Sequence, residues 1–189
     1  MRFRTLIFSI IMIGLVASCG VQALNPFYSE QNLIFDEDLV GNWTIKKGNE
    51  NWSFEAIGDS HYRLRHQEKK TESSLIVHLF KINDQLFLDF TADTDQETDE
   101  SYMGIWHYYP VHSAAKLDLK KNKATIQFFG GQGLEELIED PKQNIGFAKT
   151  ADEFMPGILT GSTNDIQKLL LKNMEDDSFF SDAIELVKE

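Results

Sequence analysis

The chain has 189 residues, with 18 Lys and Arg against 30 Asp and Glu, so its formal net charge is −12 at pH 7. This length suggests one domain, and an apolar content of 42% is enough for a hydrophobic core. The acidic balance argues against binding nucleic acid through its phosphates, and a single cysteine excludes an intrachain disulfide and a cysteine-based zinc site.

The first residues have the order of an export signal. Arg2 and Arg4 form a basic start, residues 6–16 are mainly apolar, and small residues follow. An apolar run of this length is too short to span a hydrocarbon core of about 30 Å comfortably. We therefore predict a signal peptide over residues 1–18 rather than a transmembrane helix.

Cys19 lies directly after this predicted signal. The order Val16, Ala17, Ser18, Cys19 resembles the lipobox of bacterial lipoproteins, in which the cysteine carries a diacylglycerol and becomes the acylated N-terminus. The resemblance implies a protein held in the cell envelope by a lipid on Cys19. Because Gly20 rather than Asp follows, it favours the outer membrane if the cell is Gram-negative. The alternative is an ordinary secretory signal followed by a structural cysteine.

After cleavage the chain loses two arginines and no acid, so its formal charge becomes −14. Residues 19–38 are expected to form the lipidated N-terminus and a linker, with a short anchoring segment at 32–35. The membrane is therefore an expected partner only through the lipid anchor, since an acidic body gains nothing from an anionic bilayer.

Between residues 39 and 129 apolar side chains recur at every second position, which is the pattern of half-buried strands. Short turns rich in Gly, Asn and Asp separate the runs. Sequential strands of this kind predict an antiparallel up-and-down barrel, which leaves no free edge. The alternative is a half-open barrel covered by C-terminal helices. Eight strands are expected, at 42–46, 52–56, 61–66, 74–82, 85–90, 102–109, 111–120 and 123–129.

The pattern changes at Gly130, and residues 130–189 are predicted to be a helical extension packed on the barrel. A short helix is expected over 132–139. A second is expected over 163–174, where Ser162 and Asp165 have the spacing of a capping box. A last amphipathic segment, 179–187, is expected to dock on the barrel by its apolar residues.

The first predicted strand begins with Leu-Val-Gly-Asn-Trp at residues 39–43. Gly41 and Trp43 are similar to the Gly-x-Trp signature of lipocalins. That resemblance implies an eight-stranded barrel in which Trp43 plugs the closed end. Lipocalins usually stack a basic residue from the end of the last strand over this Trp, and the predicted last strand offers Lys123, at its beginning.

The mature chain is also similar to a group of uncharacterised bacterial lipoproteins over most of residues 26–170. This resemblance implies no particular activity and no functional residues. The similar stretches are 33–36, 39–43, 86–89, 110–113 and 158–160.

Aromatic residues on the predicted strands are the candidate ligand-binding residues. They could line a pocket for a lipid or another hydrophobic small molecule, or they could fill the narrow interior of a small barrel. The first reading predicts a non-enzymatic binding protein, and the second predicts an interaction or accessory module of an envelope complex. The candidates are Trp52, Phe54, Tyr62, Trp106, Tyr108 and Phe128.

No catalytic residue, metal site or cofactor is predicted. Ser60 follows Gly-Asp as in the first block of SGNH esterases, but no Asp-x-x-His follows near the C-terminus, so a turn is expected. His61 and His66 should point to opposite faces of one strand, and His112 should point outward. The acidic residues 93–100 could bind calcium weakly, or could simply solvate a hairpin.

Overall fold

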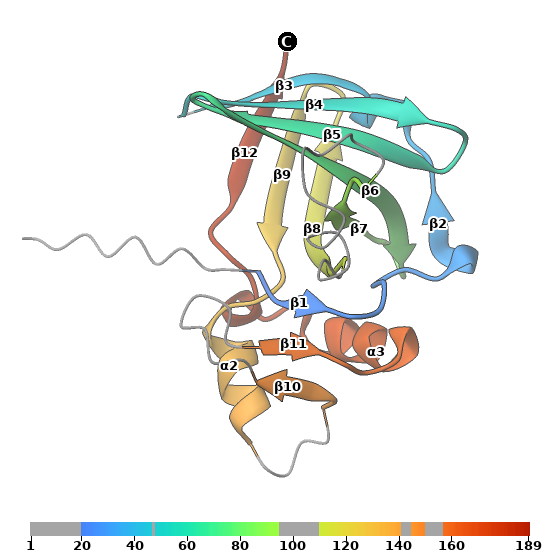
Figure 1. Ribbon diagram of the computed structural model, residues 1–189, viewed down its shortest axis with the longest axis vertical. Helices are drawn as coiled ribbons and strands as arrows, with labels where there is room; N and C mark the ends of the chain where they lie inside the picture. Colours follow the sequence, from blue (N-terminus) through green and yellow to red (C-terminus); the bar gives the residue numbers. More distant parts are fainter. Residues whose placement is uncertain (1–19, 47, 95–109, 141–144, 150–156) are drawn as a thin grey trace, which may run out of the picture.

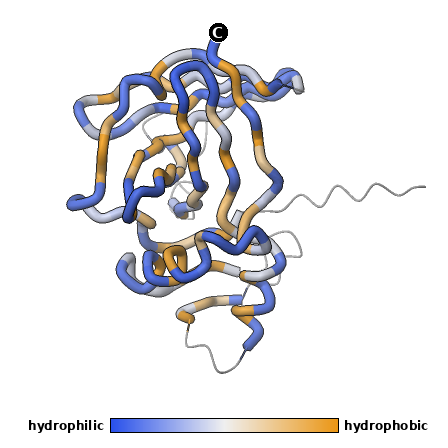
Figure 2. The backbone as a smooth tube through the Cα atoms, turned by 180° about the vertical axis from the view of Figure 1, so that it is seen from behind, coloured by the Kyte–Doolittle hydropathy of each residue, from blue (hydrophilic) through white to orange (hydrophobic). Residues whose placement is uncertain are grey.

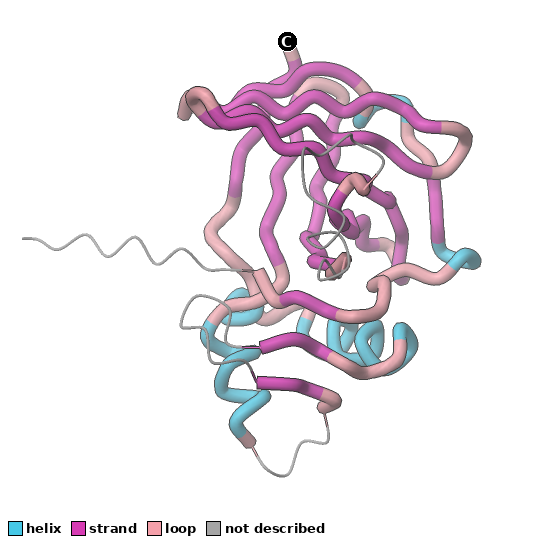
Figure 3. Tube along the Cα trace, viewed as in Figure 1, coloured by secondary structure: helices cyan, strands magenta, loops and turns pink. Residues whose placement is uncertain are grey.

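The computed structural model describes residues 20–46, 48–94, 110–140, 145–149 and 157–189. Its described strands join into a single hydrogen-bonded sheet, most of which curls into a closed barrel (Figures 1 and 3). The barrel strands are β3 (Gly41–Ile45), β4 (Glu50–Ile57), β5 (His61–Glu68), β6 (Thr71–Ile82), β7 (Gln85–Ala92), β8 (His112–Lys120), β9 (Lys123–Phe128) and β12 (Ile184–Lys188).

Every neighbouring pair in the barrel is antiparallel, as the alternating sequence pattern predicts. Strands β3 to β9 pair in chain order, and β12 lies between β9 and β3 and pairs with both. This ring of eight strands confirms the predicted antiparallel barrel in its closed form. Closure leaves β3 and β9 without a free edge.

The strand that closes the ring differs from the prediction. The strand expected at 102–109 lies outside the described residues, and the eighth strand is β12. The expected domain boundary at residue 129 therefore leaves out part of the barrel. Residues 130–189 are also not wholly helical, since they contain β10 (Phe147–Lys149) and β11 (Gly157–Leu159). Strands this short hold too few residues for their period to separate them from a helix.

The barrel interior is a packed core. Side chains from every barrel strand, at alternate positions, are buried in one cluster. Figure 2 shows hydrophobic and hydrophilic residues interspersed along the chain. Burying one such side chain contributes about 1.5–3 kcal/mol. The buried members of this cluster are Leu39, Trp43, Trp52, Phe54, Tyr62, Leu64, Val77, Leu79, Leu88, Phe90, Ala115, Leu117, Ala124, Ile126 and Leu186.

A second core covers the outer wall of β6, β7 and β8. Phe80 and Phe87 project outward from β6 and β7 and stack with ring centroids 5.5 Å apart. Ile166 and Leu170 of helix α3 (Thr163–Asn173) are buried in the same cluster. The central strands thus pack apolar side chains on both faces, which explains why residues 74–82 carry apolar side chains on both faces of the strand.

The N-terminal segment is part of the fold and not the linker that was expected over 19–38. Strand β1 (Gln22–Ala23) pairs with β8 and, in parallel, with β11. Strand β2 (Leu33–Ile34) pairs with β6, and Phe27 between them is fully buried. The apolar residues of this segment are spaced without a regular period, so the sequence offers no pattern from which to predict the packing.

The two predicted helices are confirmed as α2 (Gln132–Glu139) and α3. The Ser162 hydroxyl accepts the backbone N–H of Asp165 at 3.3 Å and donates to its carboxylate at 2.6 Å, so the expected cap is present. Short 3₁₀ helices lie at Glu30–Asn32, Glu37–Leu39 and Asp177–Phe179. Within the described parts of the chain, no helix has the length and apolar character needed to cross a bilayer.

Candidate functional site

Trp43 lies buried where the chain enters the barrel. Its indole N–H donates to the backbone oxygen of Leu39 at 2.8 Å. The Lys188 ammonium lies 5.2 Å from the centroid of the Trp43 ring and donates to the backbone oxygen of Asp38 at 2.7 Å. A basic residue at the end of the last strand therefore does stack on the Trp, as in lipocalins. It comes from β12 and not from Lys123.

Gly41 is required by this packing. Its φ of +130° belongs to a region that side-chain-bearing residues rarely adopt, and a Cβ atom there would lie 2.9 Å from Cε of Lys188. The Gly-x-Trp pattern thus has a local physical cause, because the glycine makes room for the lysine that covers the tryptophan.

The described candidate ligand-binding residues all contribute to the inner wall. Trp52, Phe54 and Tyr62 are buried in the interior cluster, and Phe128 packs against it with its ring 5.3 Å from that of Phe90. Trp106 and Tyr108 lie outside the described residues. The placement satisfies both sequence-based hypotheses, and all four described residues belong to or pack against one continuous apolar cluster.

Tyr62 has a structural role in this wall. Its hydroxyl accepts the backbone N–H of Asp36 at 2.7 Å and donates to the Asp36 carbonyl at 3.1 Å. Burial, with a contribution from the Asp36 charge, raises the pKa of Tyr62 to about 12, although the backbone hydrogen bond opposes the shift. The ring also stacks on Phe35 with centroids 5.0 Å apart. Tyr62 therefore fastens the N-terminal segment to the barrel.

His66 lies on the interior side and His61 on the outer wall, so the two point to opposite faces as predicted. Nε2 of His66 is 2.9 Å from the Glu50 carboxylate, and its ring contacts the edge of Trp52. The Trp52 indole nitrogen is buried and has no hydrogen-bond partner among the described residues. Among the aromatic side chains of the described interior, Trp52 is the one whose polar atom lacks a hydrogen-bond partner.

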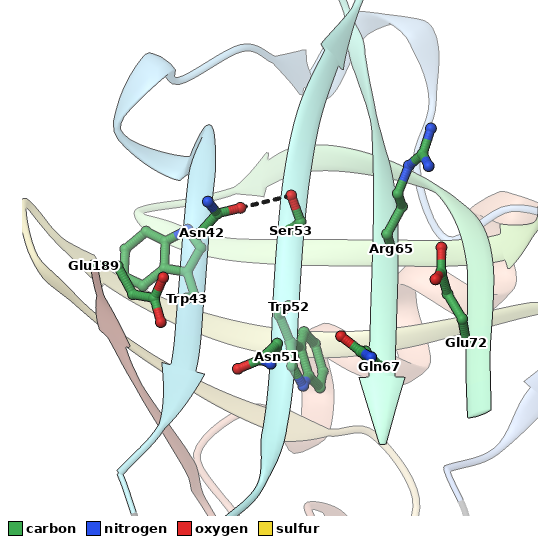
Figure 4. Close-up of a pocket in the computed structure, with 9 residues that line it drawn as sticks. All are labelled: Asn42, Trp43, Asn51, Trp52, Ser53, Arg65, Gln67, Glu72 and Glu189. Carbon is green, nitrogen blue, oxygen red and sulfur yellow. Dashed lines mark hydrogen bonds between the residues drawn. The ribbon is translucent and has the colours of Figure 1, made fainter. Parts of the chain in front are cut away.

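A hollow of about 410 Å³ opens on the other side of these strands, on the outer wall of β3, β4 and β5 (Figure 4). We call it the outer hollow. Its polar side chains form two rows across the sheet, because Asn42, Ser53 and Arg65 are paired in register, as are Asn51, Gln67 and Glu72. The lining residues are Asn42, Trp43, Asn51, Trp52, Ser53, Arg65, Gln67, Glu72 and Glu189.

The outer hollow has the chemistry of a polar binding surface. Its side-chain amides offer both donors and acceptors, Arg65 offers a donor fork, and Glu72 offers an acceptor. Within it the Ser53 hydroxyl donates to the Asn42 amide oxygen at 2.8 Å. Most of these side chains are exposed, so they can exchange water for a partner. Sequence reasoning missed them because outward polar residues on a strand also suit plain solvent.

A row of titratable groups lies on the outer wall of β5 to β8. We call His61, His78, Asp89 and His112 the histidine row. The His61 and His78 rings lie 5.3 Å apart, and His78 is opposite Asp89 in the sheet. Tyr28 of the N-terminal segment stacks on His78 with centroids 4.3 Å apart. The row thus meets the segment that follows the predicted anchor.

Asp89 is fully buried and accepts two hydrogen bonds, from Nδ1 of His112 at 2.7 Å and from the backbone N–H of Phe27 at 2.9 Å. Burial raises the pKa of Asp89, although both hydrogen bonds and the His112 charge oppose the shift. Burial also lowers the pKa of His78 to about 4, with the charges of His61 and His112 adding to the effect. Asp89 and His78 of the histidine row therefore hold the N-terminal segment, through Phe27 and Tyr28, against the outer wall.

Among the described residues, no three His, Cys, Asp or Glu side chains are placed to hold a metal ion. Asp93 pairs with Arg63 at 2.7 Å and accepts from the Ser74 hydroxyl at 2.8 Å. Residues 95–100, with most of the predicted calcium ligands, lie outside the described residues. Ser60 belongs to an exposed turn, as predicted.

Comparison of the chain with known protein families, with curated proteins and with solved structures finds no match. The likenesses to lipocalins and to bacterial lipoproteins rest on the residues of this chain. To the lipocalin likeness alone, the fold adds the closed barrel and the Lys188 that covers Trp43.

Proposed function

We propose that the protein is a lipid-anchored lipoprotein of the cell envelope whose packed barrel serves as a scaffold for an interaction at its outer wall. The order of the signal residues and the place of Cys19 support the anchor, and Gly20 favours the outer membrane. The packed interior supports the scaffold, and it is the observation that carries this proposal. Trp52, Phe54 and Tyr62 are all engaged in one continuous core.

The outer hollow is the surface through which we propose that a protein partner binds. Asn51 and Gln67 lie side by side in register, and such amides can pair with the N–H and C=O groups of a peptide backbone. Arg65 and Glu72 add charges of both signs, which can fix the orientation of a partner. The role that we propose for this surface is binding without catalysis.

A photo-crosslinking amino acid at Gln67 tests the surface in the full-length protein in membranes. We expect a discrete adduct whose partner peptides map to an envelope protein, and we expect Ser53→Trp to abolish it by filling the outer hollow. The same crosslinker at Glu135, on the exposed side of α2, is the matched control and should give no such adduct. Equal labelling from both positions would overturn the assignment of the outer hollow.

A second candidate function is the binding of an apolar small molecule inside the barrel. The inward position of Trp52, Phe54, Tyr62 and Phe128 favours it. An organic extract of the native protein should then contain a single apolar compound at about one molecule per chain. Extracts that match a blank preparation would remove this candidate and leave the interaction module.

The anchor has its own test. Cells fed a labelled fatty acid should label the wild-type protein but not a Cys19→Ala variant, and the variant should remain uncleaved or leave the membrane fraction. Continued membrane partitioning after a verified loss of the label would contradict the proposed mode of attachment. Several acyl chains bury enough CH₂ groups, at about 0.8 kcal/mol each, to make release negligible.

A further inference from the structure

The fold begins immediately after the proposed lipid-bearing residue. Gly20 forms an antiparallel bridge with Gly130, and the backbone N–H of Val21 donates to the Phe129 oxygen at 2.8 Å. A Cβ atom on Gly20 would lie 3.4 Å from Cβ of Phe128, so this residue is held against the end of β9. There is no spacer between Cys19 and the folded body.

The length of chain between the lipid and the folded body sets how far a lipid-anchored body can move from the bilayer. Adjacent Cα atoms are about 3.8 Å apart, whereas an extended linker of about 20 residues reaches roughly 65 Å. A lipid on Cys19 must therefore bring the surface around Gly20 to the level of the headgroups. The body cannot rotate freely above the membrane.

The surface around Gly20 is built from segments that are fixed to one another. The backbone N–H of Gly130 donates to the Phe179 oxygen at 2.9 Å, and that of Ser181 donates to the Phe128 oxygen at 2.9 Å. The 3₁₀ helix Asp177–Phe179 thus lies beside the glycine turn. We call this surface the Gly20 face, formed by Gly20, the 130–131 turn and residues 176–182.

We propose that, in the lipid-anchored protein, the Gly20 face lies against the headgroups of the bilayer. This inference rests on the proposed lipidation of Cys19. The outer hollow includes Glu189, which ends the molecule at the far end of its long axis, whereas β1 starts near the junction of the barrel with the helices (Figure 1). The proposed orientation therefore leaves the outer hollow free for a partner.

The charge of the Gly20 face selects the kind of lipid. Asp176, Asp177 and Asp182 are exposed on it. Hydrogen bonds from Ser178 lower the pKa of Asp176, so this carboxylate remains charged at neutral pH. The ammonium of Lys116 is turned to the Met174 oxygen, at 3.1 Å. An acidic face of this kind suits zwitterionic headgroups and is repelled by anionic ones.

Fluorescence quenching on vesicles tests the orientation. The lipidated full-length protein is reconstituted into phosphatidylcholine vesicles that carry a headgroup quencher. Single cysteines are introduced as Asp182→Cys on the Gly20 face and Asn51→Cys in the outer hollow, and lipidation leaves each as the only free thiol. We expect at least five-fold stronger quenching at position 182 than at position 51, and partial loss of that difference in vesicles rich in phosphatidylglycerol.

Insertion of 20 Gly and Ser residues between Cys19 and Gly20 is the matched control. It preserves the anchor and should make quenching at the two positions nearly equal. Equal quenching with the native junction, in protein whose acyl groups are verified by mass, would overturn the orientation alone. Absence of the acyl groups would instead overturn the anchor on which the orientation rests.

Discussion

Acidification is expected to destabilise the protein through His78, at the centre of the histidine row. Tyr28 stacks on its imidazole with centroids 4.3 Å apart, and the His61 ring lies 5.3 Å away. The opposite residue in the sheet, Asp89, is already engaged by His112. A proton on His78 would therefore create a partly buried charge beside two other imidazoles, with the nearby carboxylate already hydrogen-bonded.

The magnitude follows from the pKa of His78, which burial and the neighbouring histidine charges lower from 6.5 to about 4. Above pH 6.5 this side chain is neutral in both the folded and the unfolded state. Between pH 6.5 and about 4 only the unfolded chain binds the proton, so the free energy of unfolding falls as the pH falls. At 1.36 kcal/mol per pKa unit the loss is at most about 3 kcal/mol, and about 2 kcal/mol after allowance for partial exposure.

Urea unfolding at about pH 7 and about pH 4.5 measures the loss, with His78→Phe as the comparison because phenylalanine keeps a ring beneath Tyr28. The wild type should lose about 2 kcal/mol more than the variant between these pH values. Asp89, whose raised pKa acts in the opposite direction, is present in both proteins and cancels. Equal losses would refute the reasoning.

The Tyr28→Ala variant provides an independent check on the cause. Removing this ring uncovers His78, so an NMR titration of the imidazole should give a pKa that rises from about 4 toward 6.5. A pKa that stays near 4 in the variant would show that cover by Tyr28 does not produce the shift.

Three further predictions test the closure of the barrel by β12, the contact of Lys188 with Trp43 and the cap of α3. Leu186→Ala should cost about 2–5 kcal/mol of unfolding free energy, because Leu186 is 1% exposed in the strand that closes the barrel. Val187 is only half-buried, so Val187→Ala should cost less. Similar losses would argue against closure by β12. Lys188→Ala should cost about 1–2 kcal/mol through its contacts with Trp43 and the Asp38 oxygen, with Lys188→Arg retaining most of the stability; a chemical denaturation curve that does not move would refute the contact. Ser162→Ala should cost about 0.5–2 kcal/mol by removing the α3 cap, and an unchanged thermal midpoint would contradict that role.

The strands of the barrel were predictable wherever one face meets the core and the other meets water. Residues 61–66 alternate between inward Tyr62 and Leu64 and outward Arg63 and Arg65, and the strand there is β5. The cap at Ser162 was equally clear, because its chemistry is local. Both features depend only on residues close together in the sequence, so they can be read from one sequence.

The features of the fold that the sequence did not predict depend on contacts between residues far apart in the chain. Lys188 covers Trp43 across 145 positions, and Phe27 reaches Asp89 across 62. The pairing of β12 between β3 and β9 follows from the need to close two sheet edges, and no periodicity in five residues reveals it. The packing of the N-terminal segment, for which the sequence predicts a linker, depends on distant contacts of the same kind.

The outer hollow and the histidine row could not be predicted from the sequence, because the register of the paired strands brings their residues together. Asn51 and Gln67 become neighbours only once β4 and β5 pair with one particular alignment, and the same holds for His78 and Asp89. A shift of one residue would send these side chains to the other face. Trp52, Phe54, Tyr62 and Phe128, by contrast, lie on strands as predicted, because each belongs to an alternating apolar pattern.

Native mass spectrometry of the full-length protein extracted from membranes tests the lipid-anchored, packed barrel most directly. We expect the mass of the chain from Cys19 onward plus its acyl groups, with nothing further released when the protein unfolds. An additional apolar molecule at one per chain, lost on unfolding, would contradict the packed interior, and an unmodified Cys19 would contradict the anchor.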